Sequence, residues 1–428
     1  MNGLAFPSAS AHAMSTLQET IHQMGQQART AAYKLAQLSS DEKDTILRAM
    51  AAAVRQRVPE LLDANAKDLT AGREKGLSSA MLDRLMLDEK RIEAMAAGIE
   101  QVATLPDPVG QVLDAWQRPS GIRIEQVRVP IGTIGIIYES RPNVTADAAV
   151  LCFKTGNATI LRGGSEAIHS NRAIAAALAE AGAPDHAIQL IPFTDRESVA
   201  VLAGMDKWLD LIIPRGGKGL IETVVSLARM PVIKHYDGIC HLFADAAADQ
   251  EMAISLTVNS KTHKCGVCNA LETLLIHQDI AAEFLPKVAA ALRAKGVELR
   301  GCEKTQAILT DVIPAHEDDW STEYLDLILS IKIVNSLEDA VSHINHYGSH
   351  HTDVIVTRDD ATAERFLREV DSACVFHNVS TRFADGGEFG FGAEIGISTD
   401  KLHARGPMGL RELTSYQYRV RGDGQLRE

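Results

Sequence analysis

Two blocks in which strand-like and helix-like segments alternate constrain the fold of this chain most strongly. The first block runs from Ile131 to residue 244, and the second begins at Glu272 and ends near residue 385. Apolar runs that alternate with helical segments are typical of parallel sheets whose two faces are covered by helices. The sequence therefore predicts an α/β protein with two doubly wound parallel-sheet domains.

The individual elements are expected from the period of the apolar residues. In the first block the expected strands are IGTIGIIY, Ala158–Gly163, AIQLIPF, LDLIIPRGG and PVIKHYDG, and the expected helices are Ala146–Lys154 and Ser170–Ala181. In the second block the expected strands are ETLLI, AILTD, Leu329–Val334, DVIVT and ACVFHN, and the expected helices are Asp279–Lys295, Leu337–Asn345 and Ala361–Val370.

The segment from Ser15 to Val109 has the period of helices throughout. One amphipathic helix is expected to begin with Ser40 or Asp41 as its cap, and another is expected to span Asp88–Leu105. The apolar residues expected to share one helical face are Ile46, Met50, Val54 and Leu61. The sequence LPDPVG ends this region, because its prolines break helices.

Strand-like alternation between Ala115 and Pro130 indicates a two-stranded ribbon with Pro-Ser-Gly as its turn. The tail of the chain is again strand-like near its end and is a candidate to pair with this ribbon. An isolated hairpin is only marginally stable in water, so we expect the ribbon to add to the sheet of another subunit. The ribbon and the tail, residues 115–130 and 398–428, therefore predict a homodimer or homotetramer.

Composition limits the partners and the compartment. The chain has 428 residues, a formal net charge of −13 and no basic block, which argues against nucleic acid as a partner. Six cysteines in so long a chain do not make a disulfide framework, so we expect a reducing compartment, the cytoplasm. No run is apolar enough to span a membrane, and the N-terminus lacks the pattern of a signal peptide; we interpret residues 1–14 as a flexible leader.

The stretch VNSKTHKCGVCNALE, residues 258–272, carries the residues best suited to nucleophilic chemistry. Small neighbours leave Cys268 open to a substrate, and Lys261, His263 and Lys264 supply the positive charge that a nucleophilic thiol needs. Most cysteines are instead small buried hydrophobes, and this alternative stays open on the pattern alone. A redox pair or half of a zinc site are further alternatives for the C-x-x-C motif, although no second such motif completes a four-thiolate site.

Two glycine pairs follow predicted strands: Gly163-Gly164 after Arg162, and Gly216-Gly217 after Arg215. Glycines at strand ends let backbone N–H groups approach a phosphate, and the arginines can pair with it. Glycine pairs are also common in ordinary turns between a strand and a helix. Because no G-x-G-x-x-G follows a predicted strand and no G-x-x-x-x-G-K-[ST] occurs, the pairs alone leave both interpretations open.

Five stretches of the chain resemble the aldehyde dehydrogenase superfamily, most closely the branch that reduces an acyl phosphate in proline biosynthesis. They lie within residues 130–167, 212–221, 232–245, 260–275 and 382–410 and include PIGTIGIIYESRPN, IIPRGGKGLI, VIKHYDGICH, SKTHKCGVCNA and GEFGFGAEIGISTDKLHARGPMGL. The resemblance covers nearly the whole chain after the leader. It implies an NADP-binding domain in residues 15–114 and 131–244, a catalytic domain in residues 245–385, and an oligomerisation ribbon.

By this resemblance Cys268 is the nucleophile, and the side-chain amide of Asn143 and the cysteine's own backbone N–H hold the oxyanion. A preorganised donor of this kind contributes about 3–4 kcal/mol of transition-state stabilisation. The implied reaction is the reduction of L-glutamyl 5-phosphate by NADPH to L-glutamate 5-semialdehyde and phosphate, through a thioester. The implied partner, besides this substrate, is the glutamate kinase that supplies it. Without the resemblance, Asn143 is better interpreted as a turn residue.

The resemblance also implies a cofactor site. Many members of the superfamily carry a ribose-binding glutamate where this chain has Ser165, and its loss makes room for a 2′-phosphate that Arg162 can neutralise, although Glu166 follows directly. This pattern favours NADP over NAD. The residues implied to bind the cofactor are Arg162, Gly163, Gly164, Ser165, Arg215, Gly216, Gly217 and Glu323.

Two departures from the superfamily bear on the reaction. Oxidising members carry a general-base glutamate where this chain has KHYDGICH; His235 or a neighbour takes its place, which suits a reductase whose thioester avoids water. Cys265 has no part in the catalytic role. We prefer a structural role to a zinc site for His235, Cys240 and His241, so no metal is expected. The side chains expected to bind the acyl phosphate are Arg141, Lys261, His263 and Lys264.

Two other functions stay open at this point. The first is NAD-dependent aldehyde oxidation with water by an enzyme of the same fold. The second is a non-enzymatic binding or structural role, against which the pair of Cys268 and Asn143 argues.

Overall fold

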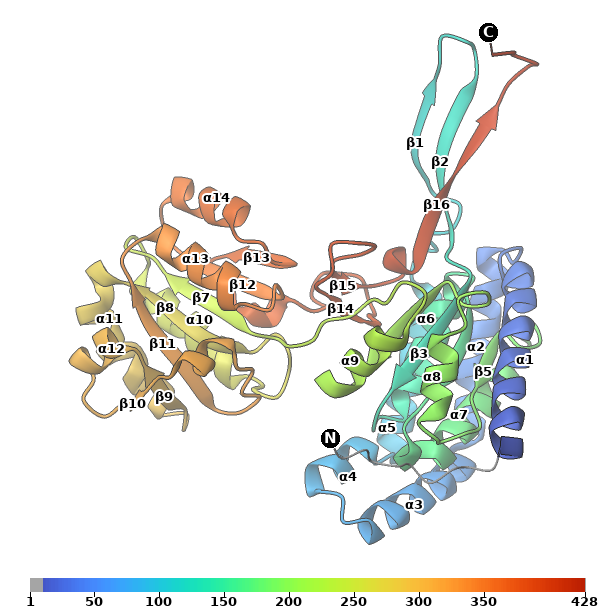
Figure 1. The fold of residues 1–428 in the computed structure, drawn as a ribbon, viewed down its shortest axis with the longest axis horizontal. Helices are drawn as coiled ribbons and strands as arrows, with labels where there is room; N and C mark the ends of the chain where they lie inside the picture. The colour runs from blue at the N-terminus through green and yellow to red at the C-terminus, as the bar shows by residue number, and fades with distance from the viewer. Residues whose placement is uncertain (1–10, 428) are drawn as a thin grey trace. The chain divides into compact units, whose positions relative to one another are not determined.

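The described residues form two compact units (Figure 1). The structure, a computed structural model, describes residues 11–427. One unit contains the chain up to Ile233, the segment Phe391–Gly396 and the chain from Met408 onward; the other contains Lys234–Gly390 and Ile397–Pro407. Residues 1–10 of the predicted leader lie outside the described residues. The assignment of cofactor binding to one domain and of catalysis to another stays a prediction.

The first unit contains a four-stranded parallel sheet in the order β5-β4-β3-β6. Its strands are β3 (Thr133–Tyr138), β4 (Ala158–Arg162), β5 (Ile188–Leu190) and β6 (Leu211–Arg215). The helices α6 (Asn143–Lys154), α7 (Ile168–Ala179) and α8 (Glu197–Ala203) connect them, and α9 (Lys218–Leu227) follows β6. The whole of β3 is buried, as its unbroken apolar run predicts. The order reverses at β3, so the carboxyl ends of β3 and β6 flank the switch point where ligands of such sheets bind.

Helices cover this sheet and also precede it in the chain. They are α1 (Ala11–Leu35), α2 (Ser40–Gln56), α3 (Val58–Glu74), α4 (Ser79–Leu85) and α5 (Glu89–Thr104). The expected cap of α2 is wrong by one residue, since Ser39 accepts from the backbone of Glu42 and completes a capping box. Leu61 lies on the next helix and not on α2, because α3 starts afresh with a proline in its first turn. The predicted helix near 88–105 is confirmed, with Asp88 as its cap.

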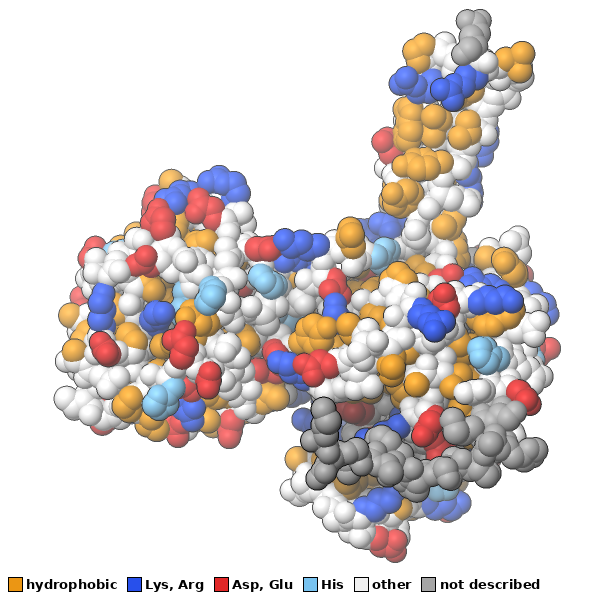
Figure 2. Space-filling view, viewed as in Figure 1, with side chains coloured by type: hydrophobic (Ala, Val, Ile, Leu, Met, Phe, Trp, Pro, Cys, Tyr) orange, Lys and Arg blue, Asp and Glu red, His pale blue; other side chains and the backbone are white. Residues whose placement is uncertain are grey.

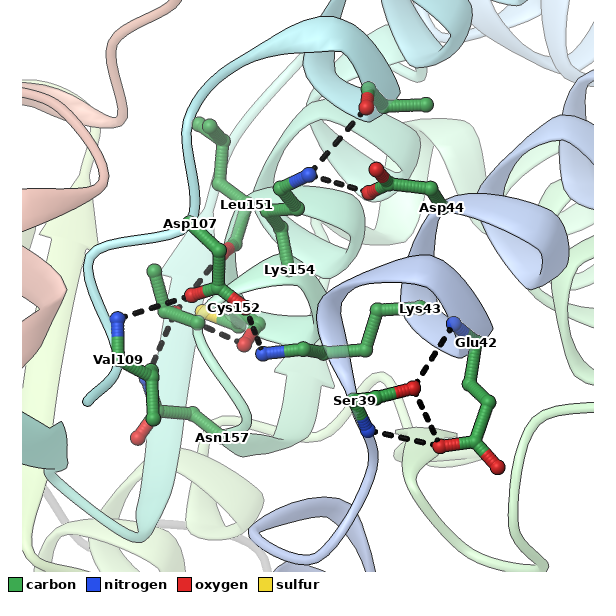
Figure 3. Close-up of polar contacts among 12 residues, drawn as sticks. Ser39, Glu42, Lys43, Asp44, Asp107, Val109, Leu151, Cys152, Lys154 and Asn157 are labelled. Atoms are coloured by element: carbon green, nitrogen blue, oxygen red, sulfur yellow. Dashed lines mark hydrogen bonds and ion pairs between the residues drawn. The ribbon is translucent and has the colours of Figure 1, made fainter.

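Two buried lysines tie the helices of this unit together (Figure 3). The ammonium of Lys154, on α6, pairs with Asp44 on α2 and donates to the carbonyl of Ala103 at 3.2 Å. The ammonium of Lys43 pairs with Asp107, whose other carboxylate oxygen accepts from the backbone N–H of Val109 at 2.9 Å. Each buried cation therefore has a carboxylate, which is the condition for keeping a charged lysine inside a fold.

The second unit contains a seven-stranded parallel sheet in the order β10-β9-β11-β8-β7-β12-β13. Its strands are β7 (Cys240–Ala244), β8 (Leu271–His277), β9 (Glu298–Gly301), β10 (Ile313–Pro314), β11 (Ile328–Val334), β12 (Thr352–Val356) and β13 (Cys374–His377). Its helices are α10 (Gln250–Thr262), α11 (Gln278–Arg293), α12 (Glu303–Ile308), α13 (Leu337–Tyr347) and α14 (Asp360–Glu369). With two such sheets, the predicted fold class is confirmed.

Two expected strands are wrong. The run AILTD forms no strand: Ala307 and Ile308 are the last two residues of α12 (Glu303–Ile308), and Leu309 is its C-cap. The run PVIKHYDG forms no strand; Val232 makes a single bridge to Ile212, and β7 begins only at Cys240. A proline at its start and a glycine near its end explain why this run does not join a sheet.

The predicted ribbon and its pairing with the tail are confirmed. Strands β1 (Val112–Gln117) and β2 (Arg123–Pro130) are antiparallel, and β16 (Thr414–Arg421) pairs with β2 on the other side. The three strands extend away from the sheet of their own unit (Figure 1) and carry apolar side chains along their length (Figure 2). The large exposed ones are Val112, Leu113, Trp116, Tyr416, Tyr418 and Val420. An exposed apolar surface of this kind marks a place for contact with another protein.

The remaining strands are short. β14 (Gly396–Ser398) and β15 (Gly406–Met408) lie in the segments where the chain passes from one compact unit to the other. Of the helices between residues 11 and 427, none combines the length and the apolar character needed to cross a membrane.

Loss of a buried lysine should destabilise the first unit. Lys154→Met removes a fully buried ammonium and leaves the mostly buried Asp44 carboxylate without its partner, so we expect the free energy of unfolding to fall by about 3 kcal/mol. Urea unfolding followed by circular dichroism measures this loss. The control Lys67→Met, which breaks an exposed pair with Asp63, should change it little. Equal stability of the two variants would contradict the role of the buried pair.

Candidate active site

Cys268 lies in the loop between α10 and β8 and is partly exposed. The residue that follows it anchors this loop: the side chain of Asn269 donates to the carbonyl of Ala384 at 2.9 Å, and its own carbonyl accepts from the hydroxyl of Thr381 at 2.6 Å. The carbonyl of Cys268 accepts from the thiol of Cys240 at 3.3 Å. The backbone that carries the cysteine is therefore fixed on both sides, while its side chain stays accessible.

Gly238 packs directly against the backbone of Cys268. A Cβ atom at position 238 would lie 1.9 Å from the carbonyl oxygen of Cys268 and 2.4 Å from its Cα, closer than any side chain can approach. The N–H of Gly238 donates to Oε1 of Glu323 at 3.0 Å. Glu323 thus holds the segment that supports the cysteine. Its predicted contact with the nicotinamide ribose stays a prediction.

Two histidines lie beside the cysteine. His235, Cys268 and His351 each offer one possible metal-ligand atom, and these three atoms lie within 4.8 Å of one another. Gly238, Cys268 and His351 precede β7, β8 and β12, which are neighbouring parallel strands, so the topology gathers them at one edge of the sheet. His351 is fully buried, and burial lowers its pKa to about 3, so its imidazole is neutral near pH 7. It therefore provides no fixed positive charge to the site.

The predicted cations of this loop lie in different environments. Lys261 is buried, and its ammonium lies 2.6 Å from Oε2 of Glu272. Burial raises the pKa of Glu272 to about 7, although the ammonium opposes the shift. The neighbouring carboxyl group of Glu272 is therefore the partner of the Lys261 ammonium inside the fold. His263 and Lys264 are exposed, and the ring of His263 accepts from Arg382 at 3.4 Å. These two side chains can reach an incoming anion.

Asn143 is the first residue of α6 and is exposed. Its side-chain amide donates to Oδ2 of Asp147, one turn along the helix, at 2.8 Å. Burial raises the pKa of Asp147 to about 6, so the acceptor is ionised near pH 7. One N–H of the amide is fixed by this bond, and the amide has a second N–H that can donate to a ligand. Sequence analysis missed Asp147, although its i, i+4 spacing from Asn143 was a signal.

Arg162 holds the first cofactor loop of the prediction. It is 8% exposed, and its guanidinium donates to the hydroxyl of Ser198 at 3.2 Å and to the carbonyl of Thr194 at 3.0 Å. Gly163 and Gly164 are buried and lead into the 3₁₀ helix η1 (Ser165–Ala167), on which Ser165 is exposed. The carboxylate of Glu166 accepts from the backbone N–H of Ser140 at 2.6 Å, so it ties this loop to the one after β3.

The second glycine pair leads into the start of α9. Gly217 is the N-cap of α9, and no side chain caps it; the N–H of Gly217 donates to Glu139 at 3.1 Å. A Cβ at Gly217 would meet only open space. An uncapped helix start beside the switch point of a parallel sheet is the arrangement that binds phosphate groups of dinucleotides. That Arg215, Gly216 and Gly217 bind the cofactor stays a prediction, since the carboxylate of Glu139 already accepts from the N–H of Gly217.

Arg141, in the first unit, feels the charge of two other arginines. Partial burial, followed by the charges of Arg84 and Arg215, lowers the pKa of Arg141. Cations that converge in this way favour an anionic ligand, because an anion relieves their repulsion. Sequence analysis identified Arg141 and Arg215 but missed Arg84, which lies on α4 and far away in sequence.

The candidate residues divide between the two units. In the first unit the structure gathers Arg141, Asn143 and the two glycine loops at the carboxyl ends of β3, β4 and β6. In the second unit it gathers Cys268, His263, Lys264 and Glu323 around the loop before β8. Each group is thus assembled by the topology of its own sheet.

Comparison with known proteins agrees with this organisation. The family model described as "Aldehyde dehydrogenase family" matches residues 8–307. The gamma-glutamyl phosphate reductase of Moorella thermoacetica is 57% identical over 408 residues, which cover 94% of this chain and 98% of that protein. The gamma-glutamyl phosphate reductase of Geobacter metallireducens is 55% identical, with 96% and 100% covered. The crystal structure of the Thermotoga maritima enzyme of the same name has a TM-score of 0.94 at 47% identity, with 95% and 100% covered.

The chain therefore belongs to the aldehyde dehydrogenase family, in the branch of the gamma-glutamyl phosphate reductases. It is an oxidoreductase that acts on a small molecule and uses a nicotinamide cofactor.

A side chain at position 238 should disable the site. In Gly238→Ala the new methyl group forces the Cys268 backbone to move, so we expect turnover to fall by about 100-fold, the size of effect that a shift of about 1 Å produces. Steady-state turnover of nicotinamide with the aldehyde substrate measures this. The matched control is Gly98→Ala in α5, where a Cβ meets nothing within 4 Å and turnover should be retained. Full activity of Gly238→Ala would refute the importance of this contact.

Proposed function

We propose that this enzyme reduces L-glutamyl 5-phosphate to L-glutamate 5-semialdehyde and phosphate with NADPH, through a thioester on Cys268. The observation that carries the proposal is a partly exposed cysteine on an anchored loop, in a chain 57% identical over nearly its full length to a gamma-glutamyl phosphate reductase. That reaction belongs to proline biosynthesis.

For this reaction the chain must supply a nucleophile, donors that hold the oxyanion, and a thiolate that can leave again. The Cys268 sulfur attacks the γ-carbonyl carbon, a C–S bond forms, and the C–O bond to phosphate breaks with its electron pair leaving on the phosphate. The oxyanion of the tetrahedral species is assigned to the amide of Asn143, oriented by Asp147, and to the backbone N–H of Cys268. The nicotinamide cofactor, when bound, supplies the hydride that reduces the thioester. The thiolate then leaves, and the anchored loop holds it ready for another acyl phosphate.

The anionic substrate needs cations. Arg141, with Arg84 and Arg215 beside it, forms one group suited to a phosphate. His263 and Lys264 form a second, exposed group next to the cysteine. Lys261 is assigned a structural role: its buried ion pair with Glu272 connects α10 to β8, the two elements that flank the cysteine loop.

For the cofactor we propose NADP. Ser165 is exposed at the start of η1, and no carboxylate stands at that position to repel a 2′-phosphate. Glu166, the nearest carboxylate in sequence, bonds to the backbone and hydroxyl of Ser140. Arg162 supplies positive charge at the end of β4, and Gly163 and Gly164 let the backbone approach the ligand. The uncapped start of α9 after Arg215, Gly216 and Gly217 is proposed to bind the pyrophosphate.

We further propose that the enzyme forms a homodimer or homotetramer through its ribbon, whose apolar side chains suit strand addition between subunits. We also propose a location in the cytoplasm, because six cysteines in 428 residues do not make a disulfide framework. A glutamate kinase is proposed as the partner that delivers the acyl phosphate, a reactive group that direct transfer protects from water.

Phosphate dependence tests this proposal against oxidation of an aldehyde by water. With L-glutamate 5-semialdehyde and NADP, formation of reduced nicotinamide should stop at about one equivalent per active site without phosphate. It should continue only when phosphate is added, because phosphate must accept the acyl group from the thioester before another turnover. Cys268→Ser should lower this rate by at least about 1,000-fold, whereas Cys265→Ser should retain it. Turnover that does not need phosphate would favour the alternative, an NAD-dependent aldehyde oxidation. An active Cys268→Ser enzyme would show that Cys268 is not the nucleophile.

A further inference from the structure

The group formed by His235, Cys268 and His351 has the donor set of a zinc site. One sulfur and two imidazole nitrogens are ligands that Zn²⁺ prefers, and sites with three protein ligands keep a fourth position for water or substrate. With Zn–S near 2.3 Å and Zn–N near 2.0 Å, one sulfur and two nitrogens in tetrahedral positions are separated by about 3.3–3.5 Å. The three donor atoms lie within 4.8 Å of one another, so a small side-chain rotation brings them to this spacing.

His351 provides an independent sign of a ligand. It is fully buried, and its Nε2 has no hydrogen-bond partner among residues 11–427. Its other nitrogen, Nδ1, lies 2.8 Å from the hydroxyl of Thr352. A buried polar atom without a partner is costly. In metal sites, one nitrogen of a histidine binds the ion while the other is held by a protein group. The contact between Nδ1 of His351 and Thr352 is of this second kind.

His235 shows the same pattern. Its Nδ1 lies 2.9 Å from the carbonyl oxygen of Ile397, a contact that orients the ring as outer contacts do for ligating histidines. The rings of His235 and His351 are 5.5 Å apart between centroids and nearly perpendicular, so both can present a nitrogen to one point. The two histidines and Cys268 come from segments before β7, β12 and β8, which are fixed by one sheet.

We infer that His235, Cys268 and His351 bind a thiophilic divalent cation, Zn²⁺ above all, and that this binding reversibly blocks the enzyme. The ion binds the thiolate form of Cys268, and the thiol proton passes to solvent. The inhibitory consequence rests on the proposed function, because a metal-bound sulfur cannot attack an acyl phosphate. The binding itself rests only on the geometry of the three residues.

Cobalt provides a readout that does not depend on turnover. Co²⁺ added to the reduced enzyme should give the charge-transfer absorption of a cobalt–thiolate bond, and Zn²⁺ should displace it. Cys268→Ala should abolish this absorption, while Cys265→Ala should retain it. His235→Ala should weaken Co²⁺ binding by at least about tenfold, since removing a ligand costs no less than removing an outer partner. His351→Ala should do the same, and circular dichroism verifies that this buried change leaves the fold intact.

Each outcome decides one point. Absorption that persists in Cys268→Ala, or unchanged affinity in His235→Ala, would overturn the metal site. In turnover assays Zn²⁺ should inhibit the wild type, a chelator should restore the rate, and His235→Ala should need at least about tenfold more Zn²⁺ relative to its own uninhibited rate. If Co²⁺ binds as expected but the enzyme turns over no acyl phosphate, the site stands and the proposed function fails.

Discussion

The close contact between Gly238 and Cys268 is the constraint on which the catalytic loop depends. The two backbones approach so closely that no other residue than glycine fits at position 238. Glu323 holds Gly238 from one side, and Asn269 and Thr381 hold the loop from the other. A nucleophile fixed in this way loses little freedom when it reacts, and such preorganisation is a main source of rate enhancement.

Buried charge is used in the same manner in both units. Lys43 and Lys154 pair with carboxylates beneath the helices of the first unit, and Lys261 pairs with Glu272 beneath the cysteine loop of the second. A buried pair adds little net stability, but removing either partner leaves a costly charge. These pairs therefore fix the arrangement of the elements around them. Arg141 in the first unit and Lys264 in the second stay exposed.

Much of this could be predicted from the sequence. The period of the apolar residues gave the two parallel sheets, and the resemblance around Cys268 and Asn143 pointed to the family. The run AILTD looked like a strand because short apolar runs suit helix and strand equally. Strand order could not be read from the chain, so the meeting of His351 with Cys268 was missed. The positions of Gly238 and Glu272 beside their partners depend on packing, which a single sequence does not reveal.

The central claim is that Cys268 carries the acyl group during turnover. The most direct measurement mixes the enzyme with L-glutamate 5-semialdehyde and NADP without phosphate, quenches it in acid, and weighs its peptides by mass spectrometry. The account predicts a glutamyl group on the peptide that contains Cys268, which disappears when phosphate is added before the quench. Active enzyme that never carries this group, or carries it only on another residue, would contradict the account.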